Sequence, residues 1–155
     1  MSTLLRAHDL GGLAEWYAAD PTRWPARPEF HPDRRWYARL ALAGDHEAWL
    51  LTWLPGQATD LHDHGGAAGA FTVLEGHLTE ATPTGGPGVE LAERSYGPGA
   101  TRRFGARHVH RIVNSGTVPA VSVHVYSPVL TRMTRYAIDG GALRIAGTEQ
   151  AGRDW

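Results

Sequence analysis

Histidines occur in this sequence as two pairs with the spacing of one strand face. His62 and His64 flank an aspartate, and His108 and His110 flank a valine. On an extended chain residues i and i+2 share a face, so each pair can aim both imidazoles at one point. Neutral imidazole suits iron, zinc, copper or nickel. One such pair is more typical of a surface pair, but two pairs shift the interpretation toward a metal site built from distant segments.

Strand-like segments surround both histidine pairs. From residue 34 the apolar residues recur with a period of two, which places Trp36 and Leu40 on one face and Arg39 on the other. Many short strands, separated by turns that contain glycine or proline, predict a sandwich or barrel. The expected strands are residues 35–42, 46–54, 70–74, 77–81, 101–104, 109–113, 120–126 and 132–138.

An amphipathic segment precedes the strands. Leu10, Leu13 and Trp16 recur at helical spacing, which predicts a helix over residues 4–20 that ends at Asp20-Pro21. No repeat or second domain is evident, so we expect a mainly β, single-domain fold with an N-terminal helical segment. Its expected parts within 1–155 are the helical segment and connector (1–33), a β-barrel (34–138) and a C-terminal extension (139–155).

Composition excludes several classes of protein. A length of 155 residues fits one domain, and a net charge of −1 gives no basic surface for nucleic acid. The chain has no cysteine, which excludes disulfides, zinc–thiolate sites and a cysteine nucleophile and fits a reducing cytoplasm. We find neither a signal peptide nor an apolar stretch of the ~18 residues that a membrane span needs. The oligomeric state is open, and a monomer would suffice.

The glycine and histidine spacing around the first pair resembles the first cupin motif. The matching positions are Gly56, His62, His64, Gly69 and Gly76. Cupins normally carry a glutamate where Gly69 stands, so the resemblance implies a site without its fourth and only anionic protein ligand. His110 followed by Asn114 resembles the histidine end of the second motif, although Pro98-Gly99 lies further upstream than that motif expects.

A more specific resemblance is to the bacterial form of the cysteine dioxygenase type I family. Residues 61–64 resemble its first iron-binding segment, and residues 109–114 its third-ligand segment. Residues 119–128 (PAVSVHVYSP) resemble its most distinctive stretch, and residues 37–39 resemble its Tyr-x-Arg substrate motif. The resemblance runs in order from about residue 35 to about residue 138 and implies a cupin fold, a small β-barrel or jelly roll.

The resemblance implies the metal ligands and the residues beside them. His62, His64 and His110 would hold iron(II), with His108 as the rival third ligand because it shares a face with His110. The catalytic residues would be Ser122, His124 and Tyr126, which alternate along one strand face and would form a hydrogen-bonded relay that ends at the Tyr126 hydroxyl. On its own that pattern is typical of a polar face in solvent.

Two further features follow from the resemblance. Arg39 would grip a substrate carboxylate with two parallel hydrogen bonds, and Tyr37 would support the same pocket. The alternative for Arg39 is an exposed strand arginine. Ser127-Pro128 would be cis, and Tyr126 would be unmodified because no cysteine is present to cross-link with it.

The implied activity is oxidation of a small thiol. We expect an iron(II)-dependent dioxygenase that converts L-cysteine and O2 to L-cysteine sulfinate in cytoplasmic cysteine catabolism. Arg39 favours L-cysteine over 3-mercaptopropionate, since relatives that prefer the latter carry glutamine there. The alternatives are the same chemistry on another small thiol, a non-redox isomerase or lyase using zinc, manganese or nickel, and a binding module.

Overall fold

Strands dominate the computed structural model, which describes residues 7–150. In chain order the elements are α1 (Ala7–Ala19), the 3-10 turn η1 (Pro21–Arg23), β1 (Trp36–Leu42), β2 (Glu47–Trp53), β3 (Leu61–His62), β4 (Ala68–Glu75), β5 (Leu78–Pro83), β6 (Leu91–Tyr96), β7 (Thr101–Phe104), β8 (Arg111–Val113), β9 (Ala120–Ser127), β10 (Arg132–Asp139) and β11 (Ala142–Gln150). Across these residues no helix has the length and apolarity that a bilayer crossing requires.

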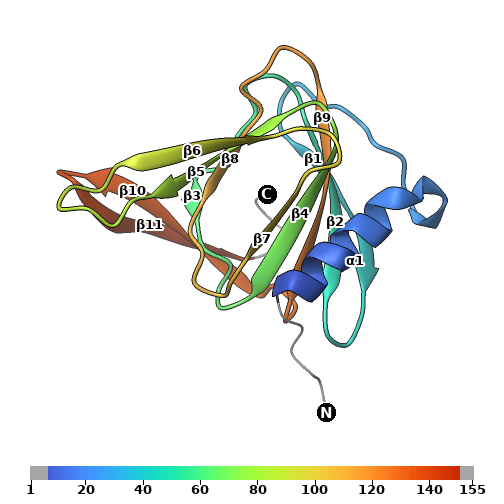
Figure 1. Cartoon of the computed structure of the whole chain (residues 1–155), viewed down its shortest axis with the longest axis horizontal. Helices are drawn as coiled ribbons and strands as arrows, with labels where there is room; N and C mark the ends of the chain where they lie inside the picture. Colours follow the sequence, from blue (N-terminus) through green and yellow to red (C-terminus); the bar gives the residue numbers. More distant parts are fainter. Residues whose placement is uncertain (1–6, 151–155) are drawn as a thin grey trace.

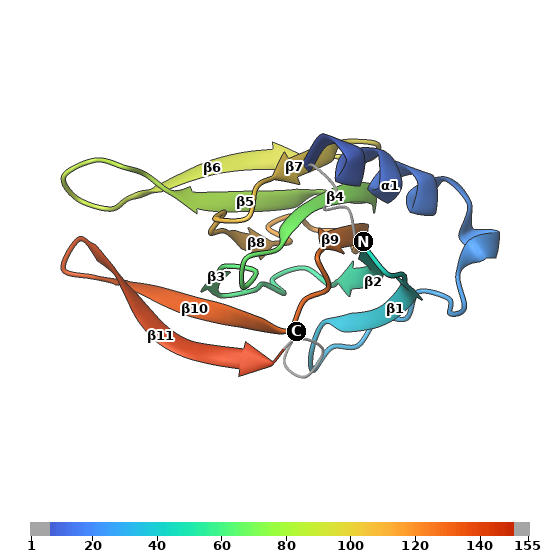
Figure 2. The ribbon, with the colours of Figure 1, turned by 90° about the horizontal axis from the view of Figure 1, so that it is seen from below.

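The strands form two layers with α1 on the outside of one of them (Figures 1 and 2). The first layer is a five-stranded sheet with the order β1-β2-β9-β4-β7. The second layer consists of two three-stranded sheets, β11-β10-β3 and β6-β5-β8. In Figure 2 the hairpins β5–β6 and β10–β11 extend together away from α1. The expected mainly β barrel with an N-terminal helix is therefore confirmed.

Alternation along β2 and β9 divides the core in two. Leu50 and Val123 belong to a cluster that packs against Leu10 of α1, whereas Leu51 and Trp53 belong to the cluster inside the barrel. α1 packs on the outer face of β4, β7 and β9, and all residues of β2 and β9 are buried. The same alternation sends every second residue of β9 into the barrel, where the polar side chains of that strand must find partners.

A backbone bridge joins the two small sheets at the histidines. The amide of His62 donates to the carbonyl of His110 (2.9 Å), and the amide of His110 donates back to the carbonyl of His62 (3.0 Å). Residues that exchange both bonds in an antiparallel pair present their side chains on the same face. Two of the predicted metal ligands are therefore neighbours because the second layer closes at this point.

Most elements match their predicted ranges, and the exceptions have physical reasons. The helix ends at Ala19 as predicted, because Asp20 accepts from the Thr22 amide (3.0 Å) and begins η1 instead; residues 4–6 of the predicted helix lie outside the described residues. Three strands were not predicted. β3 has only two residues, and β6 exposes four residues in succession, so neither shows a period of two.

The third unpredicted strand is β11, which the sequence assigned to a C-terminal extension. It pairs with β10 around Gly140 and Gly141, whose φ angles of 59° and 77° suit a two-residue hairpin turn. The Asp-Gly-Gly signal between two strand-like runs could have revealed this hairpin. The boundary at residue 138 therefore cuts through a sheet that also contains β3.

Asn114 holds together the loop that follows β8, and its removal should destabilise the fold. Its fully buried amide donates to the carbonyls of Trp53 (2.9 Å) and Val118 (2.8 Å) and accepts from the Gly116 amide (3.0 Å). Asn114→Ala leaves the Trp53 carbonyl unpaired in the interior and removes the two bonds that close the turn at Gly116 and Val118. We expect a loss of about 2–4 kcal/mol in the free energy of unfolding, measured by urea denaturation.

The neighbouring Ser115 offers a matched control for that measurement. Its hydroxyl makes an exposed hydrogen bond to Thr79 (2.8 Å). Ser115→Ala should change the unfolding free energy by less than about 0.5 kcal/mol. Equal effects of the two substitutions would contradict the role assigned to Asn114.

Candidate metal centre

Three histidines from distant segments converge inside the barrel. The donor nitrogens of His62, His64 and His110 lie within 4.8 Å of one another. Their ring centroids are 4.8–4.9 Å apart, and the side chains are 6%, 1% and 2% exposed. His62 ends β3, His64 lies in the turn after it, and His110 immediately precedes β8. The family resemblance implied this set of three, whereas the histidine spacing alone left His108 and His110 equivalent.

The hydrogen bonds of His62 and His110 occupy one ring nitrogen each, so every ring of the triad keeps at least one nitrogen to bind a metal. Nδ1 of His62 donates to the Asp60 carbonyl (2.8 Å), and Nδ1 of His110 donates to the Glu80 carboxylate (2.8 Å). Neither ring nitrogen of His64 has a hydrogen-bond partner although both are buried. Buried polar atoms normally find a partner. Three inward imidazole nitrogens without a protein partner fit a transition-metal ion.

The residue between the first two histidines faces the opposite way. Oδ1 of Asp63 accepts from the Thr134 amide (3.0 Å), and Oδ2 accepts from the Tyr136 hydroxyl (2.8 Å). Burial opposes charge on Asp63, but these hydrogen bonds outweigh it and lower the pKa of the carboxyl. Asp63 therefore fixes the His62–His64 segment to β10 and is not a ligand.

Burial keeps the three imidazoles neutral. Burial, followed by the proximity of His110, lowers the pKa of His62 to about 3. The same two causes hold the pKa of His64 well below its usual range, and burial also lowers that of His110. A histidine must be neutral to bind a metal, so the site is in its ligating state near neutral pH.

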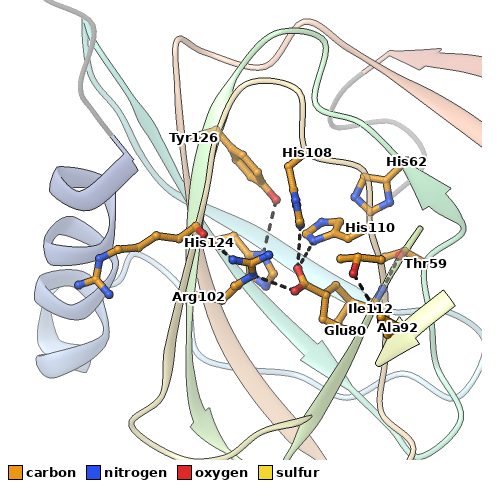
Figure 3. A network of polar contacts seen from close by, with 12 residues as sticks. Thr59, His62, Glu80, Ala92, Arg102, His108, His110, Ile112, His124 and Tyr126 are labelled. Carbon is orange, nitrogen blue, oxygen red and sulfur yellow. Dashed lines mark hydrogen bonds and ion pairs between the residues drawn. The ribbon is translucent and has the colours of Figure 1, made fainter. Parts of the chain in front are cut away.

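A charged cluster lies behind His110. Figure 3 shows Arg102, His108 and His110 directed at the Glu80 carboxylate, with distances of 2.8, 3.0 and 2.8 Å. Burial would raise the pKa of Glu80, but the hydrogen bonds from His108, His110 and Arg102 outweigh it and hold the pKa well below its usual range. His108, the rival third ligand, is thus bonded to Glu80 and lies outside the His62–His64–His110 group.

Aromatic rings confine His64. Its ring stacks on Phe104 (centroids 4.8 Å apart) and on Tyr126 (5.3 Å). A Cβ atom at Gly69 would lie 2.6 Å from the Phe104 ring and 2.9 Å from that of Tyr126. The rings of Phe104 and Tyr126 occupy the space that the side chain of a glutamate at residue 69 would need. The packing of this region therefore agrees with the absence of the fourth cupin ligand.

The polar residues of β9 lie on the inner face, as their alternation predicts. The Trp53 indole donates to the Ser122 hydroxyl (2.9 Å), which contacts Nε2 of His124 (2.8 Å). Nδ1 of His124 lies 3.5 Å from the Tyr126 hydroxyl. Burial, then the Glu47 carboxylate, raises the pKa of Tyr126, so its phenol stays protonated.

The backbone after Tyr126 also matches its prediction. The Ser127-Pro128 peptide bond is cis, as the sequence resemblance implied.

The two predicted substrate residues lie on β1 at different depths. Tyr37 packs against the inner cluster, with its ring 5.8 Å from that of Trp49. Arg39 is exposed, and its guanidinium lies 5.8 Å from the Trp49 ring centroid. The structure therefore brings Tyr37 into the barrel and leaves Arg39 at its edge.

A different arginine lines a pocket together with His62. Arg35 and His62 both line a pocket of about 100 Å³, with Asp60, Met133, Arg135 and Glu149 among its other walls. Nη1 of Arg35 is buried and has no hydrogen-bond partner. Arg135 is paired with Asp60 (3.4 Å) and Glu149 (2.7 Å). Nε of Arg135 also lacks a hydrogen bond but lies 2.7 Å from the Glu149 carboxylate, so Arg35 is the pocket cation without an ion pair to a described residue.

Sequence reasoning missed Glu80 and Arg35. Glu80 follows the buried Leu78 by two residues on β5, and an acid on the buried face of a predicted strand is a usable signal. Arg35 carries a weaker signal: it precedes Tyr37 by two residues, so it shares that face. Only the tertiary structure distinguishes it from Arg39.

The fold and the site together define a metal-binding cupin. A protein from Klebsiella pneumoniae described by its double-stranded β-helix domain aligns with a TM-score of 0.55 at 16% identity, over 95% of this chain and 99% of its own. A protein from Thermus thermophilus aligns with a TM-score of 0.54 at 26% identity, over 71% of this chain and 95% of its own. Oxalate oxidase, at 16% identity and a TM-score of 0.54, covers 70% of this chain and 59% of its own and shares the fold.

The family follows from sequence comparison. A profile of the family described as "Cysteine dioxygenase type I" matches residues 3–138. This chain belongs to the cysteine dioxygenase type I family. Human cysteine dioxygenase type 1 is 29% identical over 134 residues, and the protein of that name from Rattus norvegicus is 25% identical over the same length. Each match covers 80% of this chain and 66% of the relative, so the chain spans just under two thirds of these relatives.

Removing any one of the three converging histidines should abolish tight metal binding. His62→Ala, His64→Ala and His110→Ala should each weaken binding by on the order of 100-fold or more, because each removes one of three donors. Anaerobic titration of the metal-free protein with iron(II) or cobalt(II) against a competing chelator measures this loss.

His108→Ala is the matched control, since it removes a neighbouring imidazole that the geometry places outside the triad. Because His108 bonds the Glu80 carboxylate and lies outside the triad, its loss should weaken metal binding by less than about tenfold, well short of the loss in His110→Ala. If His108→Ala lost as much affinity as His110→Ala, the assignment of the third ligand would be wrong.

Proposed function

We propose that this protein is an iron(II)-dependent thiol dioxygenase that converts L-cysteine and O2 to L-cysteine sulfinate. The observation that carries the proposal is the convergence of His62, His64 and His110 beside a protonated Tyr126 and a pocket that contains an unpaired guanidinium. Membership in the cysteine dioxygenase type I family supports it. We place the activity in the cytoplasm, where thiols stay reduced, and in cysteine catabolism.

The three imidazoles suit the chemistry because they are neutral and leave part of the coordination sphere open. An iron(II) ion held there would supply positive charge that favours the thiolate and a redox centre that activates dioxygen. In the overall reaction the S–H proton is retained on the product acid, the O–O bond breaks and two S–O bonds form. Sulfur is oxidised and dioxygen is reduced, so no further reductant is needed.

The protein residues around the triad would orient the substrate and handle negative charge. The Tyr126 phenol stays protonated, so it can donate a hydrogen bond to charge that develops on sulfur or oxygen. His124, held by Ser122, lies behind Tyr126 and limits where its hydroxyl points. The buried rings of Phe104 and Phe71 exclude water and strengthen these interactions.

The substrate carboxylate needs a cation, and the chain offers two at and just before β1. Arg39 belongs to the segment that resembles the family's Tyr-x-Arg substrate motif, but its side chain is exposed at the edge of the barrel. Arg35 lines the pocket beside His62 and has a buried nitrogen without a partner. A planar guanidinium binds a carboxylate with two parallel hydrogen bonds. We therefore propose Arg35 as the carboxylate anchor, with Arg39 as the alternative.

The product of the reaction tests the function directly. Protein loaded anaerobically with iron(II) and then given L-cysteine and air should consume O2 and yield a product heavier by two oxygen atoms, measured by mass spectrometry. A parallel panel with 3-mercaptopropionate and other small thiols tests the substrate. Metal analysis of protein purified without added metal addresses the alternative of a zinc, manganese or nickel isomerase or lyase. If none of the thiols in the panel supported oxygen uptake, the proposal would be refuted.

Substitution of each arginine separates the two candidate anchors. Arg35→Ala should raise the KM for L-cysteine by about 10–100-fold, because a charge-assisted carboxylate contact contributes roughly 1.5–3 kcal/mol. Arg39→Ala should stay within about threefold, as expected for an exposed strand residue. Oxygen-uptake kinetics measure both, and iron content should be the same in the two variants. The reverse ranking would assign the carboxylate to Arg39.

A further inference from the structure

Glu80 is the only carboxylate within the described residues that bonds directly to a member of the triad. It is 3% exposed, and it projects from β5 toward the back of His110. One oxygen, Oε2, accepts from Nδ1 of His110 (2.8 Å) and from Nε2 of His108 (3.0 Å). The other oxygen, Oε1, accepts from Nε of Arg102 (2.8 Å). The carboxylate is thus held from both sides.

This contact distinguishes His110 from the other two histidines. An ionised carboxylate can only accept, so Nδ1 of His110 carries the proton and Nε2 keeps its lone pair for a metal. His62 bonds to a neutral backbone carbonyl in the same way, and His64 has no bond at all. A carboxylate behind a metal-binding histidine fixes its ring and raises its basicity. His110 is therefore the one ligand position with negative charge behind it.

The fold explains why negative charge enters by this route. The cupin glutamate position is occupied by Gly69, and a side chain there would collide with Phe104 and Tyr126. A carboxylate at residue 69 would therefore have to displace those rings. Glu80 approaches from the neighbouring small sheet and reaches the site through His110.

We propose that Glu80 is a positioning residue of the metal centre, which fixes the tautomer and orientation of His110 and supplies through it the negative charge that a ligating glutamate would otherwise provide. The proposal rests on the three-histidine site of the proposed function, and it is independent of which thiol the protein oxidises. His108 and Arg102 hold the carboxylate in place by occupying its remaining acceptor sites.

Glu80, His108 and His110 could also be considered as a second metal site, because their donor atoms lie within 4.8 Å of one another. Two observations oppose this. Oε2 of Glu80 already accepts two N–H bonds, and the Arg102 guanidinium bonds the other oxygen, so a second cation would have to displace these donors and face a positive charge. Hydrogen-bonded support explains the cluster without any such displacement.

Metal binding without substrate tests the proposal. We compare Glu80→Gln with the unsubstituted protein, using cobalt(II) alone against a competing chelator. Loss of the charged partner should weaken cobalt binding by about 10–100-fold. Glu93→Gln, at an exposed position of the adjacent strand β6, is the matched control and should bind as the unsubstituted protein does. Equal binding by Glu80→Gln would overturn the proposal.

A double-mutant cycle separates positioning from a merely structural effect. In a His110→Ala background, Glu80→Gln should cause no further loss of cobalt affinity, because the histidine through which Glu80 acts is absent. A further loss of similar size would show that Glu80 acts on the fold and not on His110. Binding of two cobalt ions per chain, with one lost in Glu80→Gln, would establish the second-site alternative instead.

Folding of the variants is checked on metal-free protein. If the lone Arg102 charge prevents Glu80→Gln from folding, Glu80→Gln/Arg102→Gln removes both charges, and the same affinity loss is expected. These measurements use neither thiol nor O2. Failure of the thiol chemistry would therefore leave them unchanged, and normal cobalt binding by Glu80→Gln would refute the proposal about Glu80 without affecting the proposed function.

Discussion

The backbone bridge between His62 and His110 is the interaction on which the site depends. Its two hydrogen bonds join β3 to the segment before β8 and so close the two small sheets into one layer of the barrel. The same bonds require both side chains to point to one face. His64, two residues further on, completes the triad. Closure of the barrel and assembly of the metal site are thus one structural event, and the ligands are placed by backbone pairing.

Burial and charge are balanced around this bridge. The interior keeps the triad, His124 and Tyr126 neutral, because ionisation there would cost solvation that no partner restores. Charged groups border the site behind His110, where Glu80 lies with Arg102, and in the pocket beside His62, where Arg35 lies with Asp60, Arg135 and Glu149. The first pair is mutually satisfied, whereas Arg35 retains an unpaired donor. The Glu80–Arg102 pair is therefore suited to support the metal ligand His110, whereas Arg35 is a candidate for binding the substrate.

Local period explains which parts of the fold were predictable. The inner positions of β9 depend on alternation along one strand, so the predicted face matches the structure. His64 meets His62 although it lies beyond the end of β3. β6 could not be predicted from alternation because its residues 92–95 are all exposed. β11 is preceded by a turn at Gly140 and Gly141, and the prediction did not take that turn as the sign of a hairpin. Arg39 was predicted from the resemblance of residues 37–39 to a Tyr-x-Arg motif, which carries no information about Arg35, four residues earlier. Their different depths depend on where β1 meets the edge of the barrel.

The sequence by itself determined a mainly β chain, its N-terminal helix, the family, and two histidine pairs able to bind a metal, because these depend on residue type and short-range period. The family resemblance already favoured His110 over His108. Only the tertiary structure shows that His110 converges with His62 and His64 while His108 lies outside that group, and that Arg35 rather than Arg39 lines the pocket. Residues two or four positions apart lie on the same face of a strand, so the sequence pattern cannot distinguish them. They differ only in which distant strands pack against them, and that is a property of the closed barrel.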